Sequence, residues 1–247
     1  MKEEQLVTGI ILYTSLVGEY DKRLVILTRE RGKITVFANG ARRANSQLRA
    51  ASQSFVMGKF TVIAGREAYN LVKAEVTEYF SEISFDMEKL CYASYFGELM
   101  SYYTREGDFC RDNLNLLYVT LKALVAGELP LSLIRVVYVL RLMHLEGQGI
   151  HAFSCTKCGS RENLLYFDEK TGGLLCVDCA KKKRITKRIS STALYAIQYI
   201  ESEPLGSLYG FKLKEEARLE LEQIVKAFSD EYIEKKFKSL EILATLA

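Results

Sequence analysis

The 247-residue sequence has no tryptophan, only two prolines and only two histidines. So little proline argues against a proline-rich linker protein. The sequence also lacks a GxxxxGK[ST] motif, which cradles nucleotide phosphates, and it has no clustered pair of carboxylates. These absences argue against ATP hydrolysis and against acid–base catalysis, so the sequence predicts a binding protein that is not an enzyme.

Long apolar runs are also missing. The most apolar stretch, residues 131–145, is interrupted by Arg135 and Arg141, and a membrane helix needs about 20 residues with few charges. The N-terminus carries Glu3 and Glu4 and has no apolar run of the kind that a secretory signal requires. We therefore expect a cytoplasmic protein with no membrane partner, in a compartment where thiols stay reduced.

What the sequence does contain is typical of a globular protein, with 49% hydrophobic and 26% charged residues. The formal net charge of +3 is unevenly distributed, since residues 1–80 and 151–190 are basic whereas 81–150 and 191–247 are acidic. Such alternation suggests separate surfaces with separate partners. The alternative is an ordinary fluctuation in the charge of a solvated surface.

The first 80 residues have the pattern of short strands rich in β-branched and aromatic residues. The predicted strands span 6–13, 23–28, 33–38, 55–64 and 71–80. Residues 39–54 break the pattern with an Ala-, Ser- and Arg-rich connection. Five short strands with a long connection after the third suit a small closed barrel, of which the OB-fold is the common form. An SH3-like barrel is the alternative that the pattern leaves open.

From residue 86 onward the apolar period becomes helical, as in 131–145, which is apolar nearly all round. The last two predicted helices span 212–228 and 230–244. The predicted fold class is α+β and multidomain. It has an OB-fold domain at residues 1–80, an α-helical domain at 81–150 and 187–247, and an insert at 151–186.

The insert contains the pattern C-x2-C-x17-C-x2-C, formed by Cys155, Cys158, Cys176 and Cys179. Two such knuckles, joined by a hairpin with a turn at 171–173, are typical of a zinc ribbon. Four thiolates leave no open coordination position, so the expected cofactor is one structural Zn²⁺. Two disulfides conflict with a reducing compartment, and a thioredoxin-like redox pair needs a βαβ context that is missing.

The remaining histidines and cysteines have simpler interpretations. We expect His151 to be a loop residue beside the metal site and His144 to be a core residue of the buried helix. Cys91 and Cys110 are most simply buried apolar thiols.

Two basic segments are candidates for contact with nucleic acid. The barrel segment offers Arg31, Lys33, Arg42, Arg43 and Arg49. Barrels that hold single strands combine such cations with aromatic side chains on which bases stack. The aromatic candidates are Phe37, Phe55, Phe60 and Tyr69, although a strand aromatic is more often part of the core.

The second basic segment follows Cys179 and includes Lys181, Lys182 and Arg184. It has two equally weighted interpretations, an edge that contacts phosphates and a solvated loop.

Several of these motifs together resemble one family, the RecO-type bacterial recombination mediators, over residues 5–245. The resemblance rests on Thr8-Gly9-Ile10-Ile11-Leu12, on Arg31-Gly32-Lys33, on Asn39-Gly40-Ala41-Arg42-Arg43 followed by Ser46, and on the late four-cysteine insert. Family members often have proline before the phenylalanine of the fourth strand, where this chain has Ser54. Some members lack the cysteines, whereas this chain keeps all four.

The resemblance implies an OB-fold followed by a helical domain, and it implies binding of single- and double-stranded DNA. It further implies annealing of complementary strands, including strands coated by single-strand-binding protein. With the partner RecR, the family helps to load the RecA recombinase at gaps, which implies a nucleoid-associated protein.

Residue by residue, the resemblance places Arg42 and Arg43 in the DNA-binding segment, with Arg49 less securely matched. Docking of the single-strand-binding protein's tail is implied for the helical domain. Two alternatives remain from the residues alone, an RNA- or ribosome-associated module and an interaction scaffold whose barrel binds nothing.

Overall fold

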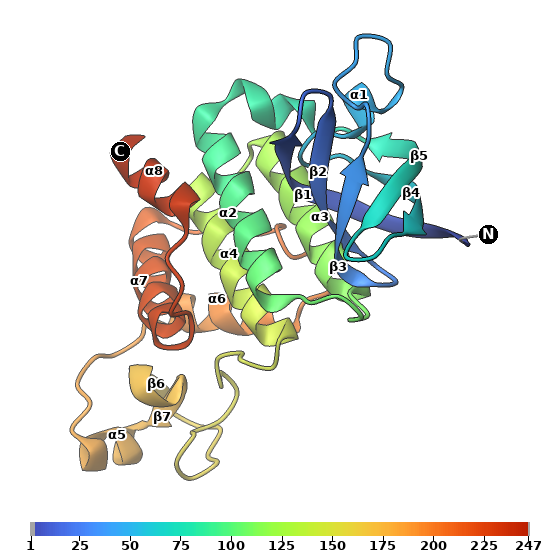
Figure 1. The fold of residues 1–247 in the computed structure, drawn as a ribbon. Helices are drawn as coiled ribbons and strands as arrows, with labels where there is room; N and C mark the ends of the chain where they lie inside the picture. The colour runs from blue at the N-terminus through green and yellow to red at the C-terminus, as the bar shows by residue number, and fades with distance from the viewer. Residues whose placement is uncertain (1–2, 247) are drawn as a thin grey trace. The chain divides into compact units, whose positions relative to one another are not determined.

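The structure is a computed structural model that describes residues 3–246, and Figure 1 shows its helices and strands. The chain divides into two compact units. One unit contains the chain up to Ala126 together with its end from Phe237 onward, and the other is Gly127–Lys236. The finer division predicted above, at residues 80, 150 and 186, stays a prediction.

The first unit begins with five strands, which are β1 (Glu4–Val17), β2 (Asp21–Thr28), β3 (Gly32–Ala38), β4 (Met57–Ala64) and β5 (Tyr69–Glu78). They form a closed barrel in the order β1-β2-β3-β5-β4. Neighbouring strands are antiparallel except β3 and β5, whose parallel pairing closes the barrel. This arrangement agrees with the predicted OB-fold barrel.

Alternation of the strand residues creates the barrel core. In β3 every second residue from Gly32 to Ala38 is buried, because successive side chains point to opposite faces of a strand. The buried core residues of the barrel are Val7, Ile11, Leu24, Ile26, Ile34, Val36, Ala38, Ala41, Val56, Phe60, Val62 and Leu71.

Most strand boundaries differ by one to four residues from those predicted, and β5, predicted at 71–80, spans Tyr69–Glu78. Two of the differences have a structural basis. β1 continues to Val17, because a register shift between Ile11 and Tyr13 lets one long strand follow the barrel. β4 begins at Met57 because the buried Phe55 has a φ of 66° and its N–H donates to the carbonyl oxygen of Ile11 over 2.7 Å. A phenylalanine at positive φ is uncommon, so the strand pattern alone predicts an earlier start.

The rest of the first unit is helical. It consists of α1 (Leu48–Ala51) in the connection from β3 to β4, a 3-10 turn η1 (Ser81–Phe85), α2 (Met87–Tyr103), α3 (Arg111–Ala126) and α8 (Lys238–Leu246). Asp86 caps α2, since its Oδ1 accepts from the N–H of Lys89 over 3.1 Å. α2 packs against β1 and α8, and α3 packs against η1, β1 and β2.

The second unit consists of three packed helices and the cysteine-containing insert. The helices are α4 (Leu131–Leu145), α6 (Ser191–Ser202) and α7 (Glu215–Tyr232). The sequence predicts a break between the last two helices at residue 229. In the structure α7 continues to Tyr232, and residues 233–237 separate it from α8. Ile233 is extended, which ends α7.

The insert forms a hairpin of β6 (Leu164–Asp168) and β7 (Gly173–Cys176), joined by the turn η2 (Glu169–Thr171) and followed by α5 (Val177–Lys183). The predicted hairpin between the two cysteine knuckles is confirmed. Among residues 3–246, every helix is too short or too polar to cross a lipid bilayer.

Candidate metal centre and nucleic-acid interface

The four predicted cysteines of the insert converge. Cys155 and Cys158 precede β6, Cys176 ends β7, and Cys179 lies in α5. Their Sγ atoms all lie within 4.8 Å of one another, and those of Cys158 and Cys176 are 3.7 Å apart. Thiolates arranged tetrahedrally around an ion at about 2.3 Å would be about 3.8 Å from each other. The cluster therefore has the donor set and the spacing of a metal site.

The first knuckle is shaped by its backbone. The N–H of Cys155 donates to Ser160 O over 2.7 Å, and the N–H of Gly159 donates to Cys155 O over 2.8 Å. Gly159 has a φ of 74°, a conformation that glycine adopts at little cost. The turn thus brings both thiols of the knuckle to one side, as the spacing predicts.

Local electrostatics treat the four thiols unequally. Burial acts to raise the pKa of Cys155, but hydrogen bonds from the backbone of Cys176, Lys157 and Cys158 outweigh burial. Together they lower the pKa of this thiol to about 6. For Cys179, burial and the neighbouring thiols raise the pKa to about 12. Four thiolates this close together repel one another, so a cation that binds them would stabilise the fully deprotonated cluster.

The insert is attached to the rest of its unit through α7. Gly172, at the hairpin turn, has a φ of 60°, and a Cβ there would lie 2.6 Å from Phe228 and 2.9 Å from the hydroxyl of Tyr232. Within the insert, the ammonium of Lys183 donates to the buried carboxylate of Asp168. Burial acts to raise the pKa of Asp168, but the contact with Lys183 and the hydrogen bonds from Thr171 and the backbone of Lys170 together lower it.

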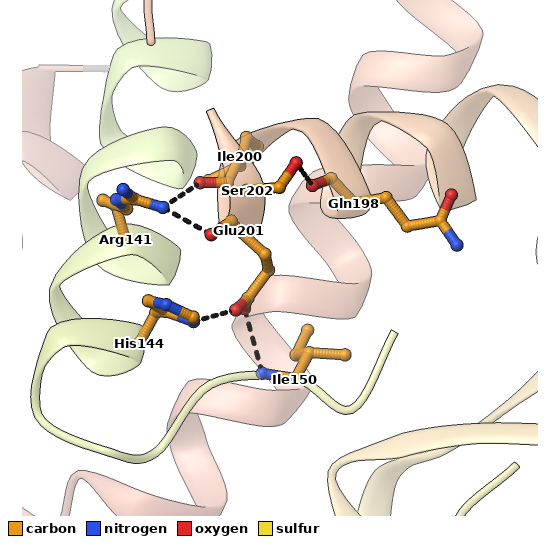
Figure 2. A network of polar contacts seen from close by, with 7 residues as sticks. All are labelled: Arg141, His144, Ile150, Gln198, Ile200, Glu201 and Ser202. Carbon is orange, nitrogen blue, oxygen red and sulfur yellow. Dashed lines mark hydrogen bonds and ion pairs between the residues drawn. The ribbon is translucent and has the colours of Figure 1, made fainter. Parts of the chain in front are cut away.

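A polar network holds the segment that enters the insert (Figure 2). Glu201 of α6, whose side chain is 3% exposed, accepts from the N–H of Ile150 over 3.0 Å and contacts Nδ1 of His144. Arg141 of α4 donates to the carbonyl oxygens of Ile200, over 3.0 Å, and of Glu201. Burial raises the pKa of Glu201, although His144, the Ile150 N–H and Arg141 oppose the shift.

This network corrects one prediction about the histidines. His144 was expected in the core, but its side chain is 42% exposed, because it lies at the end of α4 beside Glu201. His151 is an exposed loop residue, as expected, and lies outside the cysteine cluster.

The arginines of the β3–β4 connection lie next to the β1–β2 turn. Arg42, Arg43 and Arg49 are all exposed. Nη1 of Arg42 donates to Glu19 O over 2.8 Å and to Gly18 O over 3.4 Å. These contacts place the connection against the turn, although the two segments are some 20 residues apart in sequence.

The structure adds two residues that sequence reasoning missed. Cζ of Arg43 lies 5.4 Å from the centroid of the Tyr20 ring, and Nζ of Lys22 donates to Ser52 O over 3.0 Å. Burial and the charges of Arg42 and Arg49 lower the pKa of Lys22. We call Lys22, Arg42, Arg43 and Arg49 the basic cluster. The basic cluster could have been predicted from the pairing of β2 with β3. Antiparallel pairing of Lys22 with Ala38 places the start of β2 beside the end of β3, where the arginine-containing connection begins.

Arg31 and Lys33 lie at the other end of β3 and do not join the basic cluster. The ammonium of Lys33 donates to Ser101 O in α2, and its N–H donates to Arg105 O over 3.1 Å. The carbonyl oxygen of Arg31 accepts from Gly107 N over 3.0 Å. This end of the barrel is therefore fastened to the segment between α2 and α3.

The predicted aromatic residues differ in their surroundings. Phe55 and Phe60 are core residues, at 3% and 0% exposure. Phe37 is half-buried in β3, and the hydroxyl of Tyr69 donates to Glu106 Oε1 over 3.0 Å. None of these four rings has the position of Tyr20, which is 44% exposed beside the basic cluster.

The second basic segment lies in the second unit, around the end of α5. Lys181, Lys182 and Arg184 are exposed. Neighbouring cations of the same run are paired, since Lys183 contacts Asp168 and Lys187 donates to Glu169 over 3.1 Å.

Comparison with known proteins gives matches along nearly the whole chain. The family model "Recombination protein O N terminal" matches residues 1–80, and "Recombination protein O C terminal" matches residues 84–241. A DNA repair protein RecO of Desulforamulus reducens is 30% identical over 240 residues, covering 96% of this chain and 93% of the relative. The DNA repair protein RecO of Alkaliphilus metalliredigens is 31% identical over 236 residues, covering 95% and 96%.

Proposed function

Because the chain belongs to the RecO family of DNA repair proteins, we propose that it binds single- and double-stranded DNA and anneals complementary strands, including strands coated by single-strand-binding protein. With RecR it would assist RecA loading at gaps, in the cytoplasm at the nucleoid. The observation that carries the proposal is the convergence of four cations of the barrel into the basic cluster.

The basic cluster suits annealing because annealing makes and breaks no covalent bond in the strands. Two complementary strands repel each other through their phosphates, and cations that neutralise phosphates reduce this repulsion. Bases that remain exposed can then pair. The residues proposed to contact phosphate are Arg42, Arg43 and Arg49, with Lys22 added by the structure. Arg31, Lys33, Lys181, Lys182 and Arg184 are proposed contacts outside the basic cluster.

The ion proposed for the cysteine cluster is one Zn²⁺. Four cysteine sulfurs are the donors of closed, structural zinc sites, and their binding energy, on the order of 10 kcal/mol, can fold a short insert. Cys155, Cys158, Cys176 and Cys179 would hold it. The ion would supply folding stability to β6, β7 and α5 and no catalytic step.

Annealing of two complementary oligonucleotides, one of them fluorescently labelled, tests the proposed function. The strands are used bare and precoated with the cognate single-strand-binding protein, and no nucleotide is added. We expect faster annealing in both conditions. Acceleration of bare strands alone would leave a cationic DNA binder without the mediator activity. A folded, metal-bound protein that accelerates neither would overturn the proposal and make RNA binding the next activity to test.

A further inference from the structure

Tyr20 is an exposed aromatic residue that two contacts hold in place. It belongs to the turn between β1 and β2, where its side chain is 44% exposed. Its carbonyl oxygen accepts from the N–H of Arg42 over 2.9 Å, and the guanidinium of Arg43 lies 5.4 Å from its ring centroid. The backbone of Tyr20 is therefore tied to that of Arg42, and its ring lies beside Arg43 although it is not part of the core.

The surroundings of this ring are predominantly cationic. Arg42 and Arg43 contact the turn, Lys22 follows it in β2, and the charges of Arg42 and Arg49 act on Lys22. Two acidic residues flank Tyr20 in sequence. Of these, Asp21 accepts the N–H of Gly40 over 2.7 Å and thereby fixes the start of the arginine-containing connection, and Glu19 is exposed.

An exposed ring among cations matches the chemistry of a single nucleic-acid strand. Guanidinium and ammonium groups bind phosphate, and an aromatic ring offers a surface on which an unpaired base stacks. A base within a duplex is already paired and stacked, so it gains nothing from the ring. Phosphates, in contrast, are present in both forms of DNA. The basic cluster without Tyr20 would therefore attract both forms through their charge alone.

We propose that Tyr20 stacks on an unpaired DNA base and thereby makes the basic cluster select single strands over duplex. The proposal rests on the DNA binding proposed above and deepens it by naming the residue that reads the strand type. Because the base contact is lost when two strands have paired, the product duplex binds less tightly than the single strands and is released more readily. The product duplex is then held only through its phosphates.

The test measures binding by fluorescence anisotropy at one salt concentration to three probes of equal length. These are a thymidine single strand, an abasic strand with the same phosphates, and a duplex. Tyr20→Ala should weaken binding of the thymidine strand by roughly 5- to 150-fold, the range that stacking of one base provides. Binding of the abasic strand and of the duplex should be unchanged, and Tyr20→Phe should retain the affinity of the wild type.

Tyr79→Ala is the matched control, since Tyr79 is 46% exposed in the same unit but lies outside the basic cluster. It should leave all three affinities unchanged. An equal loss on all three probes would mean that the ring only positions Arg43, and would overturn the proposal. If Tyr20→Ala binds the thymidine strand as tightly as the wild type does, the proposal about Tyr20 is overturned as well. In that case, duplex binding by the wild type would still support the proposed function. A wild-type protein that binds none of the probes would overturn both.

Discussion

Arg42 is positioned by the backbone of its own unit before any DNA is bound. Its Nη1 contacts two carbonyl oxygens of the β1–β2 turn, so little side-chain freedom remains to be lost on binding. Arg42→Ala combined with Arg43→Ala should weaken binding to all DNA sequences alike. The slope of log affinity against log salt should become less steep by about 2, because two phosphate contacts are lost. Titrations at several salt concentrations measure it.

A control with the same loss of charge separates contact from net charge. Arg66 and Arg111 are exposed, lie in the same unit and are outside the basic cluster. Arg66→Ala combined with Arg111→Ala should leave the salt slope unchanged. If the Arg42 and Arg43 variant keeps the wild-type slope, this segment is not part of the DNA site.

Two glycines with similar backbone conformations differ in what surrounds them. Gly18 and Gly32 have φ values of 54° and 61°, but a Cβ at Gly32 would lie 2.0 Å from Arg105 O, whereas nothing lies within 4 Å of one at Gly18. Gly18→Ala should cost about 1 kcal/mol for the backbone conformation alone. Gly32→Ala should lower the free energy of unfolding by about 3 kcal/mol, because the new methyl group would also push the segment between α2 and α3 away from the barrel. Chemical denaturation followed by circular dichroism compares them; equal costs would contradict the close packing.

At the scale of elements, α6 fixes the start of the insert through one buried carboxylate. The pKa of Glu201 is raised by burial, so the folded protein holds its proton more tightly than the unfolded protein does. From about pH 4.5 up to the raised pKa, this group therefore lowers the free energy of unfolding as pH rises. Glu201→Gln removes the titration. We expect the free energy of unfolding of the variant, relative to wild type, to increase over that window.

Denaturant unfolding at a series of pH values measures this difference. Glu216→Gln, at the exposed start of α7, serves as the control for loss of one charge. A constant difference between Glu201→Gln and wild type across the window would show that the carboxyl is not perturbed by burial.

The same elements illustrate which structural features the sequence predicts. The barrel strands and the cysteine hairpin follow from local patterns. These are the alternation of apolar and polar residues along a strand and the spacing of two residues between the cysteines of each knuckle. Tyr20, Lys22 and His144 depend instead on partners distant in sequence. An exposed tyrosine in a turn has no pattern of its own, and its meaning arises only when the barrel closes and brings Arg43 over it. Lys33 is the converse case, because its basic character does not reveal its contact with Ser101.

At the scale of the whole molecule, the two candidate sites belong to different compact units. The basic cluster lies in the unit that contains the barrel, and the cysteine cluster lies in Gly127–Lys236. Each unit has its own core, so loss of the metal should unfold residues 151–186 and leave the barrel folded. Cys155→Ser combined with Cys158→Ser should contain no bound zinc and should be cleaved by protease within the insert.

A double-mutant cycle tests whether DNA binding by the barrel depends on the metal. Its four proteins are wild type, the Arg42 and Arg43 double alanine variant, the Cys155 and Cys158 double serine variant, and their combination. Sites that share no contacts are additive within about 0.5 kcal/mol. We therefore expect removal of the two arginines to cost the same binding free energy, and the same change in salt slope, with and without the metal. A coupling above about 1 kcal/mol would mean that the units act on DNA as one surface. An additive loss of affinity on metal removal would instead place Lys181, Lys182 and Arg184 on the DNA as an independent contact.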